Sequence, residues 1–162
     1  MRPGFNMGVD TIEYNTYGVS NDNLAFAAQF GVKDLIIQSY LDGVVPGETR
    51  WEYDDLVALR ERVESFGLKI NALENVPTRF YDQIILNGPK RDEQIENMIY
   101  TVRNIARADI RIFGYHWMPS RVWRTGRDKI RGGALVTSFD YSVVEAAVES
   151  GEEVDGKPPM SH

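Results

Sequence analysis

Short apolar runs alternate with amphipathic segments along this chain, and this alternation limits its fold more than any other feature. Runs rich in Ile, Val, Leu and Phe predict strands at 33–39, 68–73 and 110–115, and an earlier strand is expected within 8–14. Continuous apolar runs indicate strands that are buried on both faces, as in parallel sheets. Because parallel strands need a crossover between them, the alternation predicts an α/β fold with parallel strands in βαβ order.

The segments between these runs carry helix signals. Ser20 is a suitable N-cap for a helix that reaches about residue 30, where Gly31 ends it. Asp54 or Asp55 starts a second helix, which Gly67 closes. The third helix, 92–108, has an apolar stripe formed by Ile95, Ile99, Val102, Ile105 and Ala106.

Four strand–helix units fit two architectures. One is the N-terminal half of a (β/α)₈ TIM barrel, and the alternative is a small doubly wound, flavodoxin-like sheet. Residues 18–22 contain one glycine, which is fewer than a phosphate-cradling turn usually has, so nucleotide or flavin binding is weakly supported. In the barrel interpretation, 1–149 form a partial barrel domain with a long loop at 119–140, and 150–162 form a flexible tail.

Composition excludes several classes of protein. Of the 162 residues, 43% are hydrophobic and 26% are charged, which is typical of a globular domain. The absence of cysteine excludes disulfides, thiolate catalysis and iron–sulfur ligation. A net charge of -6 argues against nucleic-acid binding. No apolar stretch approaches the roughly 20 residues of a membrane-spanning helix, and the start lacks a secretory signal, so we expect a cytoplasmic location without membrane contact.

Polar side chains follow the predicted strands, where ligands bind in both architectures. Glu74 closes one strand, where it would act as an acid, a base or a metal ligand, or else cap a loop. Tyr115 and His116 close the next strand, and His116 would accept a proton, bind a metal or play a structural part. These three residues are the catalytic candidates. One histidine with one or two carboxylates falls short of the three ligands usual for a catalytic metal, so we predict no metal site within this chain.

A basic segment follows the last predicted strand. Between Arg111 and Arg131 there are six basic residues and one acid, a local charge of +5 in an acidic chain. Such a loop over strand ends suits an anionic ligand, and Arg124 beside Trp123 is placed to clamp a carboxylate through two parallel hydrogen bonds. The alternative is a solvated loop whose charges only keep it soluble.

Several motifs together resemble the mannonate dehydratase family across about residues 31–140. They are ENVP at 74–77, RDEQIEN at 91–97, TVRNI at 101–105, YHWMP at 115–119, VWRT at 122–125 and RGGALVTSFD at 131–140. The resemblance implies a xylose isomerase-like TIM barrel. It also implies a hydro-lyase that converts D-mannonate to 2-keto-3-deoxy-D-gluconate and water in hexuronate catabolism, with Mn²⁺ or Fe²⁺ as cofactor.

The resemblance also assigns roles to residues. Glu74, Tyr115, Trp117, Trp123 and Arg124 match the N-terminal wall of the family's site, and Trp117, Trp123 and Arg124 are the expected substrate-binding residues. His116 departs from the Asn that the family commonly has there.

The family's metal ligands lie on later strands, so we expect a truncated chain that lacks the metal-binding half. Its expected partners are a sugar acid and, through exposed sheet edges, further copies of itself in a homo-oligomer. Two alternatives stay open: a non-catalytic sugar-acid-binding module, and a fragment of a sugar isomerase or epimerase-like barrel.

Overall fold

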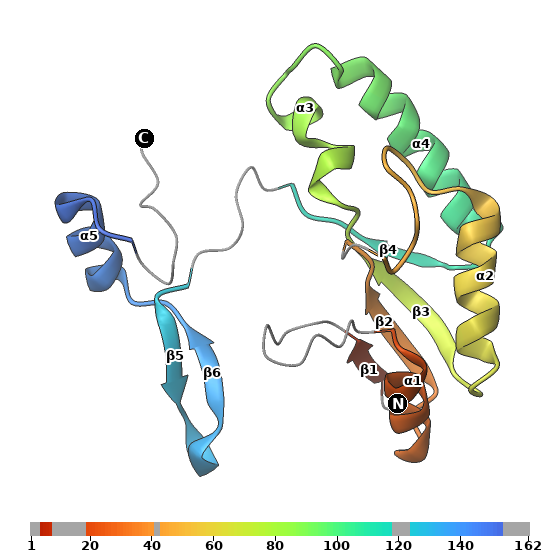
Figure 1. Ribbon diagram of the computed structural model, residues 1–162, viewed down its shortest axis with the longest axis horizontal. Coiled ribbons are helices and arrows are strands. Elements are labelled where there is room, and N and C mark those ends of the chain that lie inside the picture. The colour runs from red at the N-terminus through yellow and green to blue at the C-terminus, as the bar shows by residue number, and fades with distance from the viewer. Residues whose placement is uncertain (1–3, 8–18, 41–42, 118–123, 154–162) are drawn as a thin grey trace. The chain divides into compact units, whose positions relative to one another are not determined.

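The computed structural model describes residues 4–7, 19–40, 43–117 and 124–153 (Figure 1). The chain divides into two compact units, Met1–Pro119 and Ser120–His162, and each is described by itself. The predicted separation of a domain at 1–149 from a tail at 150–162 stays a prediction, since 154–162 lie outside the described residues. Within the described part, no helix is long and apolar enough to cross a membrane.

The first unit contains a four-stranded parallel sheet whose strands follow one another in chain order (Figure 1). Each strand pairs with the next, so the predicted α/β fold with parallel strands in βαβ order is confirmed. A flavodoxin-like sheet has the order 2-1-3-4-5, so the doubly wound alternative is wrong. The strands are β1 (Gly4–Met7), β2 (Asp34–Gln38), β3 (Lys69–Glu74) and β4 (Ile112–Gly114).

Helices connect these strands close to the predicted positions. They are α1 (Asn21–Gln29), α2 (Tyr53–Glu64) and α4 (Arg91–Arg107), with the short elements η1 (Thr78–Phe80) and α3 (Asp82–Ile85) before α4. Ser20 caps α1 as predicted, because its hydroxyl accepts a hydrogen bond of 3.1 Å from the Asn23 amide. The N-cap of α2 is Glu52, so neither Asp54 nor Asp55 has that role; both lie in the first turn, where carboxylates interact favourably with the helix dipole.

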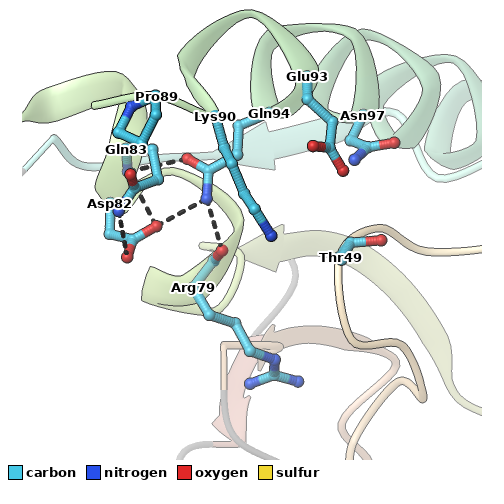
Figure 2. A pocket seen from close by; sticks show the side chains of 9 residues that line it. All are labelled: Thr49, Arg79, Asp82, Gln83, Pro89, Lys90, Glu93, Gln94 and Asn97. Atoms are coloured by element: carbon cyan, nitrogen blue, oxygen red, sulfur yellow. Dashed lines mark hydrogen bonds between the residues drawn. The ribbon is translucent and has the colours of Figure 1, made fainter. Parts of the chain in front are cut away.

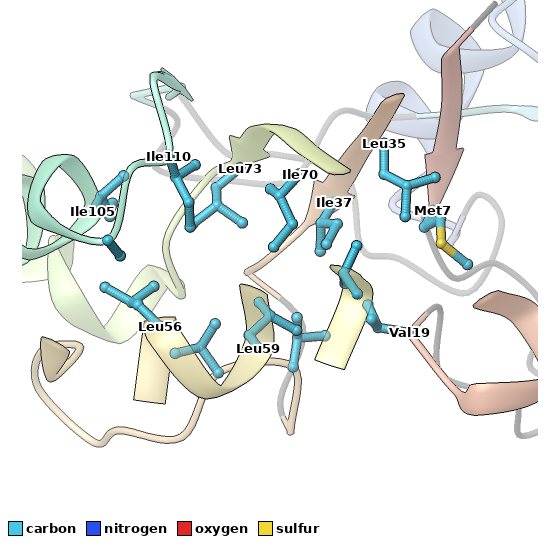
Figure 3. Close-up of a cluster of buried hydrophobic side chains, with 14 of the residues drawn as sticks. Met7, Val19, Leu35, Ile37, Leu56, Leu59, Ile70, Leu73, Ile105 and Ile110 are labelled. Atoms are coloured by element: carbon cyan, nitrogen blue, oxygen red, sulfur yellow. The ribbon is translucent and has the colours of Figure 1, made fainter. Parts of the chain in front are cut away.

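The hydrophobic core lies on one face of the sheet. Leu35, Ile37 and Leu73 are fully buried in a cluster that includes Leu56 of α2 and Ile105 of α4 (Figure 3). Side chains alternate between the faces of a strand, so their neighbours point the other way.

The opposite face carries a row of register partners. Asn6, Ile36, Ala72 and Ile112 pair with one another across the four strands. Ile36 is 39% exposed and Ile112 is 51% exposed. In the described part of this unit, the sheet therefore packs its apolar side chains against helices on one face and leaves aliphatic side chains open on the other.

Two predicted elements differ from the structure. Strand β1 precedes the predicted range 8–14, which lies outside the described residues; the sequence GFNM has only two apolar side chains, so it gave a weak strand signal. In α4, the predicted stripe is wrong at Ile99, Val102 and Ala106, which are exposed.

Polar side chains take the place of that stripe in α4. The buried residues of this helix are Thr101, Asn104 and Ile105. The Thr101 hydroxyl accepts a hydrogen bond of 3.2 Å from the Trp51 amide, and the Asn104 side chain donates one of 3.0 Å to the Trp51 carbonyl. These bonds satisfy both backbone groups of a fully buried tryptophan, so a hydrophobicity pattern could not have identified this face.

A charged network joins α4 to the start of α2. The Tyr100 hydroxyl donates to Glu52 Oε2 at 2.7 Å, Arg50 Nε donates to Glu52 Oε1 at 2.8 Å, and the Arg50 guanidinium lies 4.1 Å from the centre of the Tyr100 ring. The hydrogen bond from Tyr100, and then that from Arg50, hold the pKa of Glu52 below its usual value.

Because of this network, we expect the free energy of unfolding to decrease at acidic pH. A lowered folded-state pKa stabilises the protein above the usual glutamate pKa, and the stabilisation is lost as the pH falls through the lowered value. Tyr100→Phe removes the first bond, so we expect its loss of stability at neutral pH to shrink at acidic pH. Urea midpoints measured across that range test this, with Glu96→Gln on the exposed side of α4 as a control expected to show no such change. A Tyr100→Phe effect that is independent of pH would contradict it.

The second unit corrects the prediction of a long loop at 119–140. It contains an antiparallel hairpin of β5 (Gly126–Lys129) and β6 (Leu135–Ser138), followed by α5 (Tyr141–Ser150). Strand β5 has the polar sequence GRDK, which lacks the apolar residues by which a strand is predicted. Gly132 and Gly133 adopt the positive φ angles that the connection between the two strands requires. The predicted helix near 141–148 is confirmed: Asp140 caps it by accepting a 2.9 Å bond from the Ser142 amide, and Gly151 ends it.

Candidate functional site

Strands β2, β3 and β4 end side by side, which places their last residues at one edge of the sheet. Gln38, Glu74 and Gly114 are register partners. Glu74 is two residues beyond Ala72, so its partly buried side chain belongs to the helix-free face. The predicted catalytic carboxylate therefore lies at the carboxyl edge of the sheet, on the face that carries Ile36 and Ile112.

Hydrogen bonds fix the backbone at this edge. The buried Ser39 hydroxyl donates to the carbonyls of Asn75, at 2.7 Å, and Glu74, at 3.2 Å. The Asn75 amide donates to the Gly114 carbonyl at 2.7 Å. Asn75 has a φ of 65°, a left-handed conformation that Asn tolerates better than most residues. These bonds tie the loops after the three strands to one another.

The residues after β4 form an aromatic cluster with Tyr81. The rings of Tyr81 and Trp117 are stacked, with centroids 5.1 Å apart and planes at 21°. Tyr115 meets Trp117 edge to face at 6.4 Å, and His116 meets Tyr81 edge to face at 6.4 Å. The structure thus brings together the predicted residues Tyr115, His116 and Trp117 and adds Tyr81, which sequence reasoning missed.

The exposure of these side chains differs. Tyr115 is 74% exposed and Trp117 is 49% exposed, so both present ring surface to solvent. The Nδ1 atom of His116 is buried and has no hydrogen-bond partner among the described residues. A buried nitrogen without a partner is costly in free energy, so His116 Nδ1 is an unusual feature of this edge of the sheet.

A separate hollow of about 360 Å³ lies between the loop after β3 and the first turns of α4 (Figure 2). Its described walls include Arg79, Asp82, Gln83, Lys90, Gln94 and Asn97, and they do not include Glu74, Tyr115, His116 or Trp117. Gln94, in the wall of this hollow, uses its side chain to form hydrogen bonds to the segment that follows β3. We therefore interpret this region as a structural contact between α4 and that segment.

Gln94 makes four hydrogen bonds to this loop, and Figure 2 shows those to Arg79, Asp82 and Gln83. Its carbonyl oxygen accepts from the amides of Gln83, at 2.9 Å, and Ile84, at 3.2 Å. Its amide nitrogen donates to Asp82 Oδ1 at 2.6 Å and to the Arg79 carbonyl at 2.9 Å. The bond from Gln94, and then those from Gln83, hold the pKa of Asp82 below its usual value against the opposing effect of partial burial.

The remaining predicted residues lie elsewhere in the chain. Trp123 lies outside the described residues. Arg124 is half-buried in the second unit, ahead of the hairpin on which Arg127, Lys129 and Arg131 are exposed. Among the described residues, no group of three His, Cys, Asp or Glu side chains lies close enough to hold a metal ion, so these residues do not fit a metal cofactor by themselves.

Comparison with known families decides the relationship of the chain. The model of the family D-mannonate dehydratase (UxuA) matches residues 11–154, a range that contains all six candidate residues. This chain belongs to the mannonate dehydratase family. The family resemblance seen in the sequence motifs is confirmed, and with it the relationship to a family of lyases of carbohydrate catabolism.

Individual mannonate dehydratases agree with the family match. The mannonate dehydratase of Thermotoga neapolitana is 34% identical over 103 residues, covering 62% of this chain and 28% of the relative. That of Brachyspira hyodysenteriae is 33% identical over 117 residues, covering 71% of this chain and 32% of the relative. The chain therefore spans about a third or less of the length of these two mannonate dehydratases.

A solved mannonate dehydratase shares the fold. The crystal structure of mannonate dehydratase from Streptococcus suis serotype 2 superposes with a TM-score of 0.68 at 23% identity. The match covers 93% of this chain and 43% of that one. At this identity the likeness concerns the fold, and it supports the parallel arrangement of the four strands.

Proposed function

We propose that this chain supplies one wall of a mannonate dehydratase active site, in an enzyme that converts D-mannonate to 2-keto-3-deoxy-D-gluconate and water in hexuronate catabolism. The observation that carries the proposal is the family match over residues 11–154. Because the chain spans only 28–32% of these relatives, we propose that it contributes to substrate binding and does not complete the reaction alone.

The proposed reaction needs two proton transfers. The hydrogen on C2, beside the carboxylate, is removed as a proton, and the C3 hydroxyl leaves as water once it is protonated. The resulting enol becomes the 2-keto acid. We propose Glu74, Tyr115 and His116 as candidates for these transfers. The proposal is supported by the position of Glu74 at the strand end and by His116 Nδ1, which has no hydrogen-bond partner among the described residues.

Substrate binding is proposed for Trp117, Trp123 and Arg124. The half-exposed ring of Trp117 offers an apolar surface for the carbon chain of a sugar acid. A guanidinium such as that of Arg124 matches the geometry of a carboxylate. When bound, Mn²⁺ or Fe²⁺ would stabilise negative charge on the developing enediolate, and we propose that its ligands lie outside this chain.

We also propose that the sheet is part of a (β/α)₈ barrel. The consecutive order of the strands and the placement of the packed helices on one face support this, because a barrel interior is lined by side chains such as Ile36 and Ile112. The edges of β1 and β4 support association into a homo-oligomer, because each pairs on one side only among the described strands. A cytoplasmic location goes with this metabolic role.

Binding and turnover of D-mannonate test the proposed function. We expect D-mannonate, with Mn²⁺ present, to bind the chain, and Trp117→Ala to weaken binding by roughly tenfold, as for loss of a central aromatic contact. Isothermal titration calorimetry measures the affinity, and D-gluconate, which differs at C2, is the matched ligand control.

The products separate the remaining interpretations. Formation of a 2-keto acid by the chain alone would contradict the placement of the metal ligands outside it. Binding without product is expected of a chain that forms one wall of the site. Conversion of the sugar acid to an isomer, or no binding of D-mannonate at millimolar concentration, would overturn the dehydratase proposal.

A further inference from the structure

Tyr81 connects two loops that leave the carboxyl edge of the sheet. It lies between η1 and α3, after β3, whereas Trp117 follows β4. The Tyr81 side chain is 2% exposed and belongs to the buried hydrophobic cluster. Its ring covers one face of Trp117 at 5.1 Å and contacts His116 at 6.4 Å. A single buried ring therefore contacts two candidate site residues.

The position of Tyr81 is itself firmly held. Its carbonyl accepts hydrogen bonds of 3.1 Å from the amides of both Ile84 and Ile85, and its amide donates to the Thr78 carbonyl at 3.0 Å. Gln94 braces the same stretch of chain through the Gln83 and Ile84 amides. The ring is thus anchored through its backbone to α3 and α4 and not only by packing.

Among the described residues, Trp117 has no such anchors of its own. No hydrogen bond of its side chain occurs in the described part of the protein, and it is 49% exposed. Its described ring contacts are those with Tyr81 and Tyr115, and Tyr115 is itself largely exposed. The orientation of the Trp117 ring therefore depends chiefly on Tyr81. A side chain that is ordered before binding costs less conformational entropy when a ligand arrives.

We propose that Tyr81 is a positioning residue that fixes the plane of Trp117 for contact with a small sugar acid. The proposal rests on the proposed function, in which Trp117 contacts the substrate. Tyr81 itself acts through Trp117 and touches no substrate in this scheme. The aromatic ring, and not the hydroxyl, carries the effect.

Fluorine NMR of the full chain labelled with 5-fluorotryptophan tests the positioning directly. Three resonances are expected, from Trp51, Trp117 and Trp123, and Trp117→Phe identifies the one that belongs to Trp117. Tyr81→Leu removes the stacked ring, so we expect the Trp117 resonance to move toward its position in the unfolded chain. Tyr81→Phe keeps the ring and is expected to restore the wild-type position.

Phe80→Leu is the matched control. Phe80 is the buried neighbour of Tyr81, but its ring meets Trp51 at 5.8 Å. We expect this variant to shift the Trp51 resonance and to leave that of Trp117 in place. An unchanged Trp117 resonance in folded Tyr81→Leu would overturn the proposal. If Tyr81→Leu does not fold, nuclear Overhauser contacts between the Tyr81 and Trp117 rings in the wild type decide, and their absence overturns it.

Titration with D-mannonate separates this inference from the proposed function. We expect the affinity of Tyr81→Leu to fall about three- to tenfold, the equivalent of one lost aromatic pair, with Tyr81→Phe close to wild type. Equal affinity in all three proteins would contradict the positioning role and leave the dehydratase proposal standing. No binding to the wild type, with the Trp117 resonance still shifted in Tyr81→Leu, would contradict the proposed substrate and support the positioning role.

Discussion

Replacing Ile37 by alanine is expected to lower the free energy of unfolding by about 3 kcal/mol, whereas the same replacement at Ile36 should cost less than about 1 kcal/mol. The two residues are adjacent in β2 and of the same type, so the change in strand propensity is shared. Ile37 is fully buried against the helices and Ile36 is 39% exposed on the other face. The difference between the two variants therefore measures how much more the helix-covered face contributes to the free energy of unfolding than the opposite face does.

Urea unfolding of both variants provides the measurement, and light scattering at the same concentrations gives the molecular mass. A cost at Ile36 equal to that at Ile37 in a monomer would contradict one-sided packing of the sheet. A cost at Ile36 that grows with protein concentration, together with a mass above that of one chain, would mean that copies associate through this face of the sheet and not through the edges of β1 and β4. A monomeric mass at micromolar concentration would count against the proposed homo-oligomer.

The parts of the fold that sequence could predict are those in which local patterns and tertiary packing agree. Strand β2 has a continuous apolar run, and Ser20 and Gly31 bound the helix before it, so both elements were predicted within a few residues. The face of α4 was mispredicted because Thr101 and Asn104 are buried through bonds to Trp51, which lies 50 and 53 positions away along the chain. A hydrophobic stripe does not encode such long-range satisfaction of polar groups.

In the candidate site, too, some residues could be predicted from the sequence and others depend on long-range contacts. Glu74, Tyr115 and His116 could be selected because parallel strands bring their carboxyl ends to one edge, and this rule depends only on the order of strands and helices. Tyr81 could not, because it lies seven residues beyond β3 in a loop whose path is set by Gln94. The hairpin at 126–138 left one usable signal, the Gly132–Gly133 pair, which is typical of a short connection between antiparallel strands.

The loop that carries Tyr81 should also depend strongly on Gln94. We expect Gln94→Ala to destabilise the protein by about 2 kcal/mol, because four hydrogen bonds are lost while some of the freed groups gain water. Asn97→Ala is the matched control: Asn97 lies on the same helix and lines the same hollow, but its side chain makes no hydrogen bond in the described part of the chain. Both substitutions improve helix propensity, so only Gln94→Ala should lower the urea midpoint.

The effect of Gln94→Ala should also depend on pH through Asp82. The pKa of Asp82 is lowered chiefly by Gln94, so the native state gains stability above the usual aspartate pKa and loses it as the pH falls through the lowered value. Removing Gln94 raises the pKa of Asp82 toward normal, and the variant should therefore approach the wild type in stability as the solution is acidified. Hydrogen exchange locates the change, because the Gln83 and Ile84 amides should exchange faster in Gln94→Ala. Unchanged exchange at these two amides would mean that the hydrogen bonds from Gln94 do not stabilise the segment that carries Tyr81. The position of Tyr81 would then not depend on α4.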